Sequence, residues 1–186
     1  MFQTRLSSLI LLLIACGGCR MAAAPSNLNA VQPTPVSQAT SSAPGIPVAP
    51  AIPADTEIGL ERRRCDLRCP VYKLTLSADG KVVYEGRNFV KRTGTVRSNI
   101  DEQKLAALIA EIERVNYFSL QDKYIPGANC PQVATDYPTV ITSVRINGRS
   151  HMIEHYHGCS GSDVLQELIN LETKIDQAVN TEQWIN

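Results

Sequence analysis

Apolar and polar positions alternate along much of the chain from residue 71 onward, which is typical of β-strands with one covered face. The stretch "VYKLTLSADGKVVYEG" contains two such runs on either side of Ala78-Asp79-Gly80. A three-residue loop with Gly80 in the left-handed conformation pairs Ser77 with Lys81 and keeps the apolar positions on one face. That face consists of Tyr72, Leu74, Leu76, Val82 and Tyr84. We therefore predict a β-hairpin here and a third strand around residues 88–96.

A second hairpin is predicted from the run "PTVITSVRI" and the Asn147-Gly148 dipeptide that follows it. Asn-Gly is a preferred sequence of two-residue hairpin turns, so the turn also fixes the register of the two strands. This register places His155 opposite Val140 and brings Cys159 to the same end of the hairpin as Cys130.

Two segments have apolar residues three and four positions apart, which is typical of amphipathic helices. The first follows Asp101, a candidate N-cap residue. Its apolar stripe consists of Leu105, Leu108, Ile109, Ile112 and Val115. The second helix is predicted from about Ser162 to Val179, with Ser160 and Asp163 as a candidate capping box. Its apolar stripe consists of Val164, Leu165, Leu168, Ile175 and Val179.

The order of these elements predicts the fold class. Strands precede a helix twice, so the chain contains two similar strand-strand-helix units. We predict an α+β domain: an antiparallel sheet of about five strands with two helices packed on one face. Trp184, the single tryptophan, is predicted to close the core at the C-terminus.

The N-terminal residues have the pattern of a secretory signal, with one positive charge and then an apolar run from Leu9 to Ala15. The run is too short to cross a bilayer, which needs about 20 apolar residues. It ends in Leu13-Ile14-Ala15-Cys16, which resembles the bacterial lipobox. This resemblance implies a signal peptide at residues 1–15 and a diacylated Cys16.

The residues after Cys16 bear on where the exported chain goes. Ordinary signal-peptidase cleavage after Ala24 is the alternative, which Pro25 disfavours, and it would export the chain as a soluble protein. Gly17 stands where inner-membrane lipoproteins carry a retaining aspartate. By resemblance to proteobacterial sorting, we expect the protein at the periplasmic face of the outer membrane, held in the lipid bilayer by the acylated Cys16.

A tether is predicted between the anchor and the folded part. No charged residue occurs from Met21 to Ala54, and seven of the eleven prolines lie in this segment. Such a composition does not bury enough apolar surface to fold. We therefore divide the chain into the signal peptide, a lipidated cysteine with a disordered tether at residues 16–57, and a single domain at residues 58–186.

The charge balance limits the classes of partner. Lys and Arg together number 18, as do Asp and Glu, so no net field recruits nucleic acid. One local cluster is basic and could receive an anion or an acidic partner. It consists of Arg62, Arg63, Arg64 and Arg68. The alternative is a solvated loop, because Glu61 and Asp66 partly neutralise the cluster.

Four cysteines belong to the folded part, namely Cys65, Cys69, Cys130 and Cys159. Four cysteines allow three pairings, and sequence alone does not choose among them. The hairpin register favours a bond between Cys130 and Cys159, which leaves Cys65 to bond with Cys69 through a turn. Export into an oxidising compartment favours disulfides. A zinc site built from the four thiolates and a redox-active pair are the alternatives.

All three histidines lie in "HMIEHYHGC" and share one face of the predicted strand. His151 and His155 would be about 13 Å apart, so only His155 and His157 could bind one ion together. They would need a third ligand from Cys159 or from the loop at residues 129–136. We predict no tightly bound metal and no cofactor, with a metal site at His155 and His157 as the alternative.

The motifs of common enzymes are missing from the sequence. "GCSGS" lacks the G-x-S-x-G spacing of a nucleophile elbow, and there is no glycine-rich phosphate loop and no H-E-x-x-H. We therefore predict that the protein is not an enzyme.

One stretch also resembles a known family. "RRRCDLRCPVYKLTLSADGKVVYEG", the helix after it, the Asn-Gly hairpin and the terminal "TEQWI" resemble a bacterial domain of unknown function, numbered 6438. The resemblance implies an architecture, over residues 58–186, and no activity. We expect a non-catalytic envelope lipoprotein whose domain binds another envelope protein or a wall component. The alternative is a periplasmic metal-binding or enzymatic domain that uses the region of His155 and His157.

Overall fold

The computed structural model describes residues 51–186. Cys16, the signal peptide and most of the predicted tether therefore lie outside the described residues. Within the described part, no helix is both long enough and apolar enough to span a membrane.

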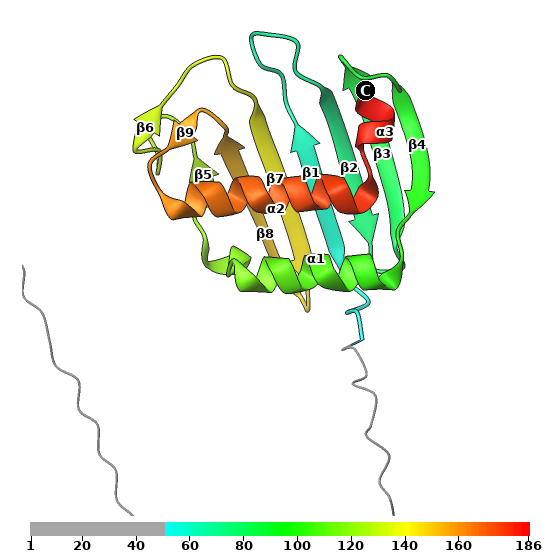
Figure 1. Cartoon of the computed structure of the whole chain (residues 1–186). Helices are drawn as coiled ribbons and strands as arrows, with labels where there is room; N and C mark the ends of the chain where they lie inside the picture. Colours follow the sequence, from blue (N-terminus) through cyan, green and yellow to red (C-terminus); the bar gives the residue numbers. More distant parts are fainter. Residues whose placement is uncertain (1–50) are drawn as a thin grey trace, which may run out of the picture. The chain divides into compact units, whose positions relative to one another are not determined.

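The domain is built on a seven-stranded sheet in the order β4-β3-β2-β1-β7-β8-β5 (Figure 1). Its strands are β1 (Glu57–Arg62), β2 (Val71–Ser77), β3 (Lys81–Asn88), β4 (Gly94–Asn99), β5 (Lys123–Tyr124), β7 (Thr139–Ile146) and β8 (Arg149–Tyr156). Two further short strands, β6 (Gln132–Val133) and β9 (Cys159–Ser160), pair with each other. Neighbours in the main sheet are antiparallel except β5, which is parallel to β8.

Two long helices lie across one face of this sheet, as Figure 1 shows. They are α1 (Glu102–Arg114) and α2 (Asp163–Val179), and a 3₁₀ helix, η1 (Tyr117–Ser119), and a short α3 (Glu182–Ile185) complete the fold. The α+β class and the two helices on one face are confirmed. The prediction of about five antiparallel strands is wrong, because the sheet has seven strands and one of them is parallel.

The first hairpin has the predicted register. Leu74 lies opposite Tyr84, and Gly80 has a φ of 74°, the left-handed conformation that the loop requires. The third strand was misplaced, because β3 continues to Asn88 and β4 begins only at Gly94. The turn between them includes Phe89, whose φ is 52°.

The second hairpin also has the predicted register, with Val140 opposite His155. Asn147 and Gly148 both have positive φ, 54° and 72°, as a two-residue hairpin turn of this type needs. At its other end, the hairpin leads through Gly158 to the short strand β9, which pairs with β6.

The central strand β1 was missed. It pairs with β2 on one side and β7 on the other, and Ile58 and Leu60 are completely buried. Residues before the predicted boundary at residue 58 also take part in the fold. Thr56 is buried, and the carboxylate of Asp55 accepts hydrogen bonds from the backbone N–H groups of the Asn147-Gly148 turn.

The structure confirms some of the predictions for the helix ends and the C-terminus. Asp101 caps α1 by accepting from the Lys104 N–H at 2.8 Å, as predicted. The predicted capping box is wrong, because Ser160 belongs to β9 and the N-cap of α2 is Ser162. Trp184 is buried and packs against Tyr84, with ring centroids 4.7 Å apart. The prediction that it closes the core is confirmed.

Candidate functional site

The face of α2 that lies against the sheet carries two carboxylates. Glu172 and Asp176 are one helical turn apart, and their side chains are 1% and 15% exposed. A buried carboxylate is costly unless opposite charges and hydrogen bonds compensate it. The partners of these two groups therefore define the polar part of the interior.

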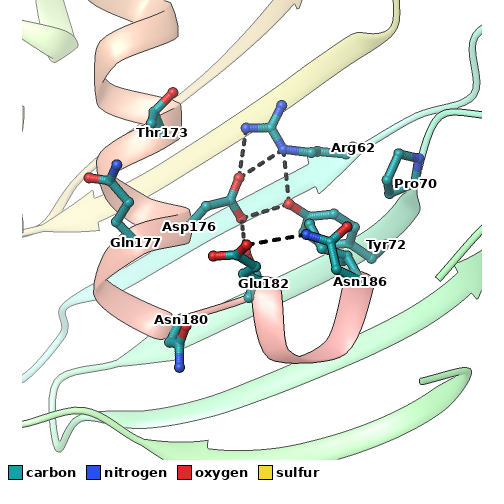
Figure 2. A pocket seen from close by; sticks show the side chains of 11 residues that line it. Arg62, Pro70, Tyr72, Thr173, Asp176, Gln177, Asn180, Glu182 and Asn186 are labelled. Carbon is teal, nitrogen blue, oxygen red and sulfur yellow. Dashed lines mark hydrogen bonds and ion pairs between the residues drawn. The ribbon is translucent and has the colours of Figure 1, made fainter. Parts of the chain in front are cut away.

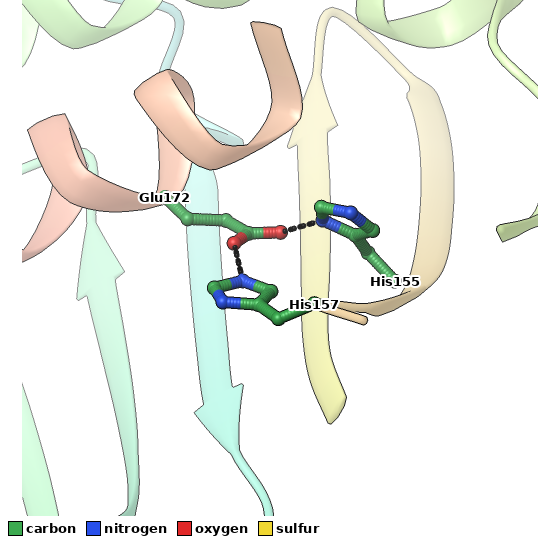
Figure 3. Close-up of side chains that lie close together, drawn as sticks. All are labelled: His155, His157 and Glu172. Carbon is green, nitrogen blue, oxygen red and sulfur yellow. Dashed lines mark hydrogen bonds and ion pairs between the residues drawn. The ribbon is translucent and has the colours of Figure 1, made fainter. Parts of the chain in front are cut away.

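Glu172 binds His155 of β8 and His157, which directly follows that strand (Figure 3). Nδ1 of His155 lies 2.9 Å from one carboxylate oxygen, and Nε2 of His157 lies 2.5 Å from the other. Strand periodicity turns both imidazoles toward α2, because they are two residues apart along the chain. Each oxygen of the carboxylate thus has its own imidazole partner.

The two histidines keep Glu172 in its charged form. Burial alone would raise the pKa of this carboxyl, but the hydrogen bonds and charges of His155 and His157 outweigh burial and hold the pKa below its usual value. The carboxylate and the two imidazoles therefore form one connected, buried hydrogen-bond network.

The same three side chains form a candidate metal centre. Their ligand atoms all lie within 4.8 Å of one another, and imidazole with carboxylate is a common ligand set for zinc. The prediction that a third ligand would come from Cys159 or from residues 129–136 is wrong, because Glu172 of α2 occupies that place. The sequence contains a signal for this ligand, because Glu172 is a charged residue at a position where the spacing of the apolar stripe of α2 indicates a buried side chain.

One observation weakens the metal interpretation. A histidine that binds a metal almost always donates its other N–H to a carboxylate, carbonyl or water. Nε2 of His155 is buried and has no hydrogen-bond partner within residues 51–186. The ligand types therefore fit a metal, but Nε2 of His155 has no partner within residues 51–186 that would orient this ring for metal binding.

Asp176 is satisfied by three other groups (Figure 2). Arg62 donates from Nε and Nη2 to one oxygen at 2.8 and 2.7 Å. The hydroxyls of Tyr72 and Thr181 donate to the other oxygen at 2.7 and 3.0 Å. Burial and the neighbouring Asp176 raise the pKa of the Tyr72 phenol, so this hydroxyl stays a donor.

A pocket of about 500 Å³ opens beside this second cluster, between α2, α3 and Pro70 (Figure 2). Its floor holds the charges of Arg62 and Asp176, which neutralise each other. Asp176 engages Nε and Nη2 of Arg62. The pocket therefore combines this ion pair with the exposed carboxylate of Glu182 in its lining.

The four arginines of the predicted cluster have different environments in the structure. Arg62 lies on β1 and points to Asp176, so its inclusion in an exposed patch is wrong. Arg63 is paired with Glu61 and Glu154 at 3.6 and 3.7 Å. Arg64 and Arg68 are exposed, and no ion pair within residues 51–186 involves them.

All four cysteines of the domain form disulfides. Cys65 is bonded to Cys69 and Cys130 to Cys159, which is the pairing that the hairpin register favoured. The four-thiolate zinc site does not fit a structure in which these thiols are bonded, whereas a redox-active pair would also be found as a disulfide in its oxidised form. The described residues contain no other cysteine.

Comparison with known proteins gives a family and no activity. A search of curated proteins returned no match. The family model described as a domain of unknown function, DUF6438, matches residues 56–179. This range covers β1 through α2, and with them both carboxylates, both histidines, Arg62, Tyr72 and both disulfides. Since the match spans most of the sequence, the chain belongs to the DUF6438 family.

Proposed function

We propose that this protein is a non-catalytic lipoprotein of the cell envelope, anchored through an acylated Cys16, whose domain binds another envelope protein or a wall component. The observation that supports it most is the internal use of the reactive groups. Both oxygens of Glu172 and of Asp176 are engaged by partners within the domain, and its four thiols are bonded. Such groups stabilise a fold and are not free to act on a substrate.

The anchor is supported by the sequence alone. An apolar run that stops at Ala15-Cys16 has the form of a lipoprotein signal, and the charge-free segment behind it suits a spacer. At the periplasmic face of the outer membrane, such a spacer would let the domain meet components of the envelope.

The anchor is tested by Cys16→Ser, with Cys19→Ser as the matched control. The wild-type protein and the Cys19→Ser variant should fractionate with membranes and carry the mass of acyl groups on residue 16. The Cys16→Ser variant should lack that mass. Equal masses for wild type and Cys16→Ser, with both proteins soluble, would show that the chain is no lipoprotein.

A second candidate function is metal binding at His155, His157 and Glu172, which the convergence of three ligand atoms favours. Elemental analysis of protein purified from the periplasm distinguishes the two. We expect no stoichiometric metal. One equivalent of zinc or copper that is lost in His157→Ala and in Glu172→Gln, with both variants folded, would replace our proposal by the metal-binding one.

A further inference from the structure

Two loops meet at the end of the sheet opposite to the one where residues 51–56 lead into β1 (Figure 1). One connects β1 to β2 and is closed by the Cys65–Cys69 disulfide, and the other connects β3 to β4. The guanidinium carbon of Arg68 lies 5.8 Å from the centre of the Phe89 ring, so the loops are in contact. We call residues 64–68 and 89–92 together the basic tip.

The basic tip exposes two large apolar side chains. Leu67 is 70% exposed and Phe89 is 51% exposed, and neither belongs to the core. The φ of Phe89, 52°, is unfavourable for a bulky residue. Strain of this kind persists where the surrounding structure imposes it, and it is frequent at functional sites. The fold therefore keeps Phe89 exposed in a strained backbone conformation, and Leu67 is exposed on the neighbouring loop.

The same loops carry an excess of positive charge. Arg64, Arg68, Lys91 and Arg92 are exposed, and none takes part in an ion pair within residues 51–186. Asp66 is the single carboxylate in the two segments, so four cations and one anion leave a net charge of +3. The nearby Arg63 and Arg87 differ, because Glu61 pairs with both.

We propose that the basic tip binds a membrane surface that carries anionic lipid headgroups. Protruding apolar side chains flanked by cations match such a surface, since the side chains enter the headgroup boundary while the cations meet phosphates. A specific protein partner usually covers about 800 Å² on each side with complementary shape. Two exposed apolar side chains provide little of that area, which favours lipid over a protein. This binding does not depend on acylation of Cys16.

The test uses a chain that begins at residue 20 and is exported behind an ordinary cleavable signal sequence. This chain retains all the described residues and has no lipid. Its binding to vesicles of phosphatidylglycerol mixed into phosphatidylcholine is compared with its binding to pure phosphatidylcholine by co-sedimentation. We expect binding only to the anionic vesicles, and weakening of that binding with added salt.

Four variants locate the binding surface. Arg64→Ala with Arg68→Ala should weaken binding about 25-fold, at about fivefold for each cation. Leu67→Ser with Phe89→Asn should weaken it roughly tenfold or more, and Asn accepts the left-handed conformation at position 89. Arg97→Ala and Met152→Ser are the matched controls, because both residues are exposed away from the basic tip. These two should bind as the wild type does.

Three results would overturn the proposal. One is equal binding to both kinds of vesicle, and a second is unchanged binding of the tip variants. The third is binding of a polyglutamate peptide, with the same dependence on Arg64 and Arg68, by a chain that binds neither vesicle. That last result would assign the basic tip to an acidic protein partner.

Discussion

Replacement of Glu172 tests whether the buried network is a real source of stability. In Glu172→Ala, the imidazoles of His155 and His157 lose the acceptor for a buried N–H, and a cavity forms in the layer between α2 and the sheet. Removal of one partner from a buried ion pair costs about 3–5 kcal/mol. Because a domain of this size is stable by about 5–15 kcal/mol, we expect a folded but marginal protein.

Glu172→Gln removes the charge of the side chain and keeps its volume, so it separates the effect of the lost charge from the effect of the cavity. The amide fills the same space and can still form hydrogen bonds to both imidazoles, so we expect a loss of about 1–3 kcal/mol. Urea unfolding at neutral pH measures both effects. With a slope of about 2 kcal/mol per M, the alanine variant should unfold at a midpoint lower by about 2 M, and the glutamine variant by about 1 M. Glu113→Gln is the control, because the Glu113 carboxylate on α1 is exposed and takes part in no ion pair among residues 51–186, and it should change stability by less than about 0.5 kcal/mol.

The pH dependence of stability is a second, independent test of this pairing. The pKa of Glu172 lies below its usual value of 4.5 in the folded protein, so its contribution to stability is present above pH 4.5 and is lost as the pH falls through the lower, folded value. The difference in stability between wild type and Glu172→Gln should therefore shrink on acidification below about pH 4.5. A loss of less than about 1 kcal/mol in Glu172→Ala at neutral pH, or a constant difference across the acidic range, would refute the paired-charge interpretation.

Two further predictions follow from the described contacts. The disulfides close loops of different length, with sequence separations of 4 and 29 residues. Chain entropy then predicts a loss of about 2 kcal/mol for Cys65→Ser with Cys69→Ser and about 3.5 kcal/mol for Cys130→Ser with Cys159→Ser, and the reverse order in urea unfolding would contradict it. Limited proteolysis should leave a fragment that starts before Asp55, because this residue is hydrogen-bonded to the second hairpin turn. N-terminal sequencing that finds a stable fragment beginning after Arg62 would mean that β1 is dispensable.

The two hairpins and two helices were predictable because each is specified locally. Gly80 and the Asn147-Gly148 dipeptide determine the strand registers through backbone conformations that few other residues adopt. The apolar stripes of α1 and α2 repeat with the helical period over several turns. No information from distant parts of the chain is needed for these assignments.

The central strand and the shape of the basic tip were not predictable in this way. β1 alternates over only a few residues before the arginines begin, and Arg62 has the polarity of a loop residue. It occupies an inward position with Ile58 and Leu60, because Asp176, 114 residues further along the chain, is there to receive it. Lys91 and Arg92 join Arg64 and Arg68 because the turn between β3 and β4 lies at residues 89–93, a segment that the sequence pattern assigned to a strand.

The polar residues inside the fold do carry a signal when two elements are compared. Glu172 continues the three-and-four spacing of Leu165, Leu168 and Ile175 on α2. His155 lies opposite Val140 and is one of the alternating positions of β8 that face the core. A buried carboxylate and a buried imidazole each require a hydrogen-bond partner, and here each is the partner of the other. Asp176 and Arg62 repeat the relationship one turn further along α2. A shift of α2 by one turn in one direction would bring Leu168 to the two histidines, and a shift in the other direction would bring Asn180 to Arg62, so either shift leaves one cluster without its carboxylate. The two clusters therefore fix the position of α2 along the sheet, which apolar contacts alone do not specify.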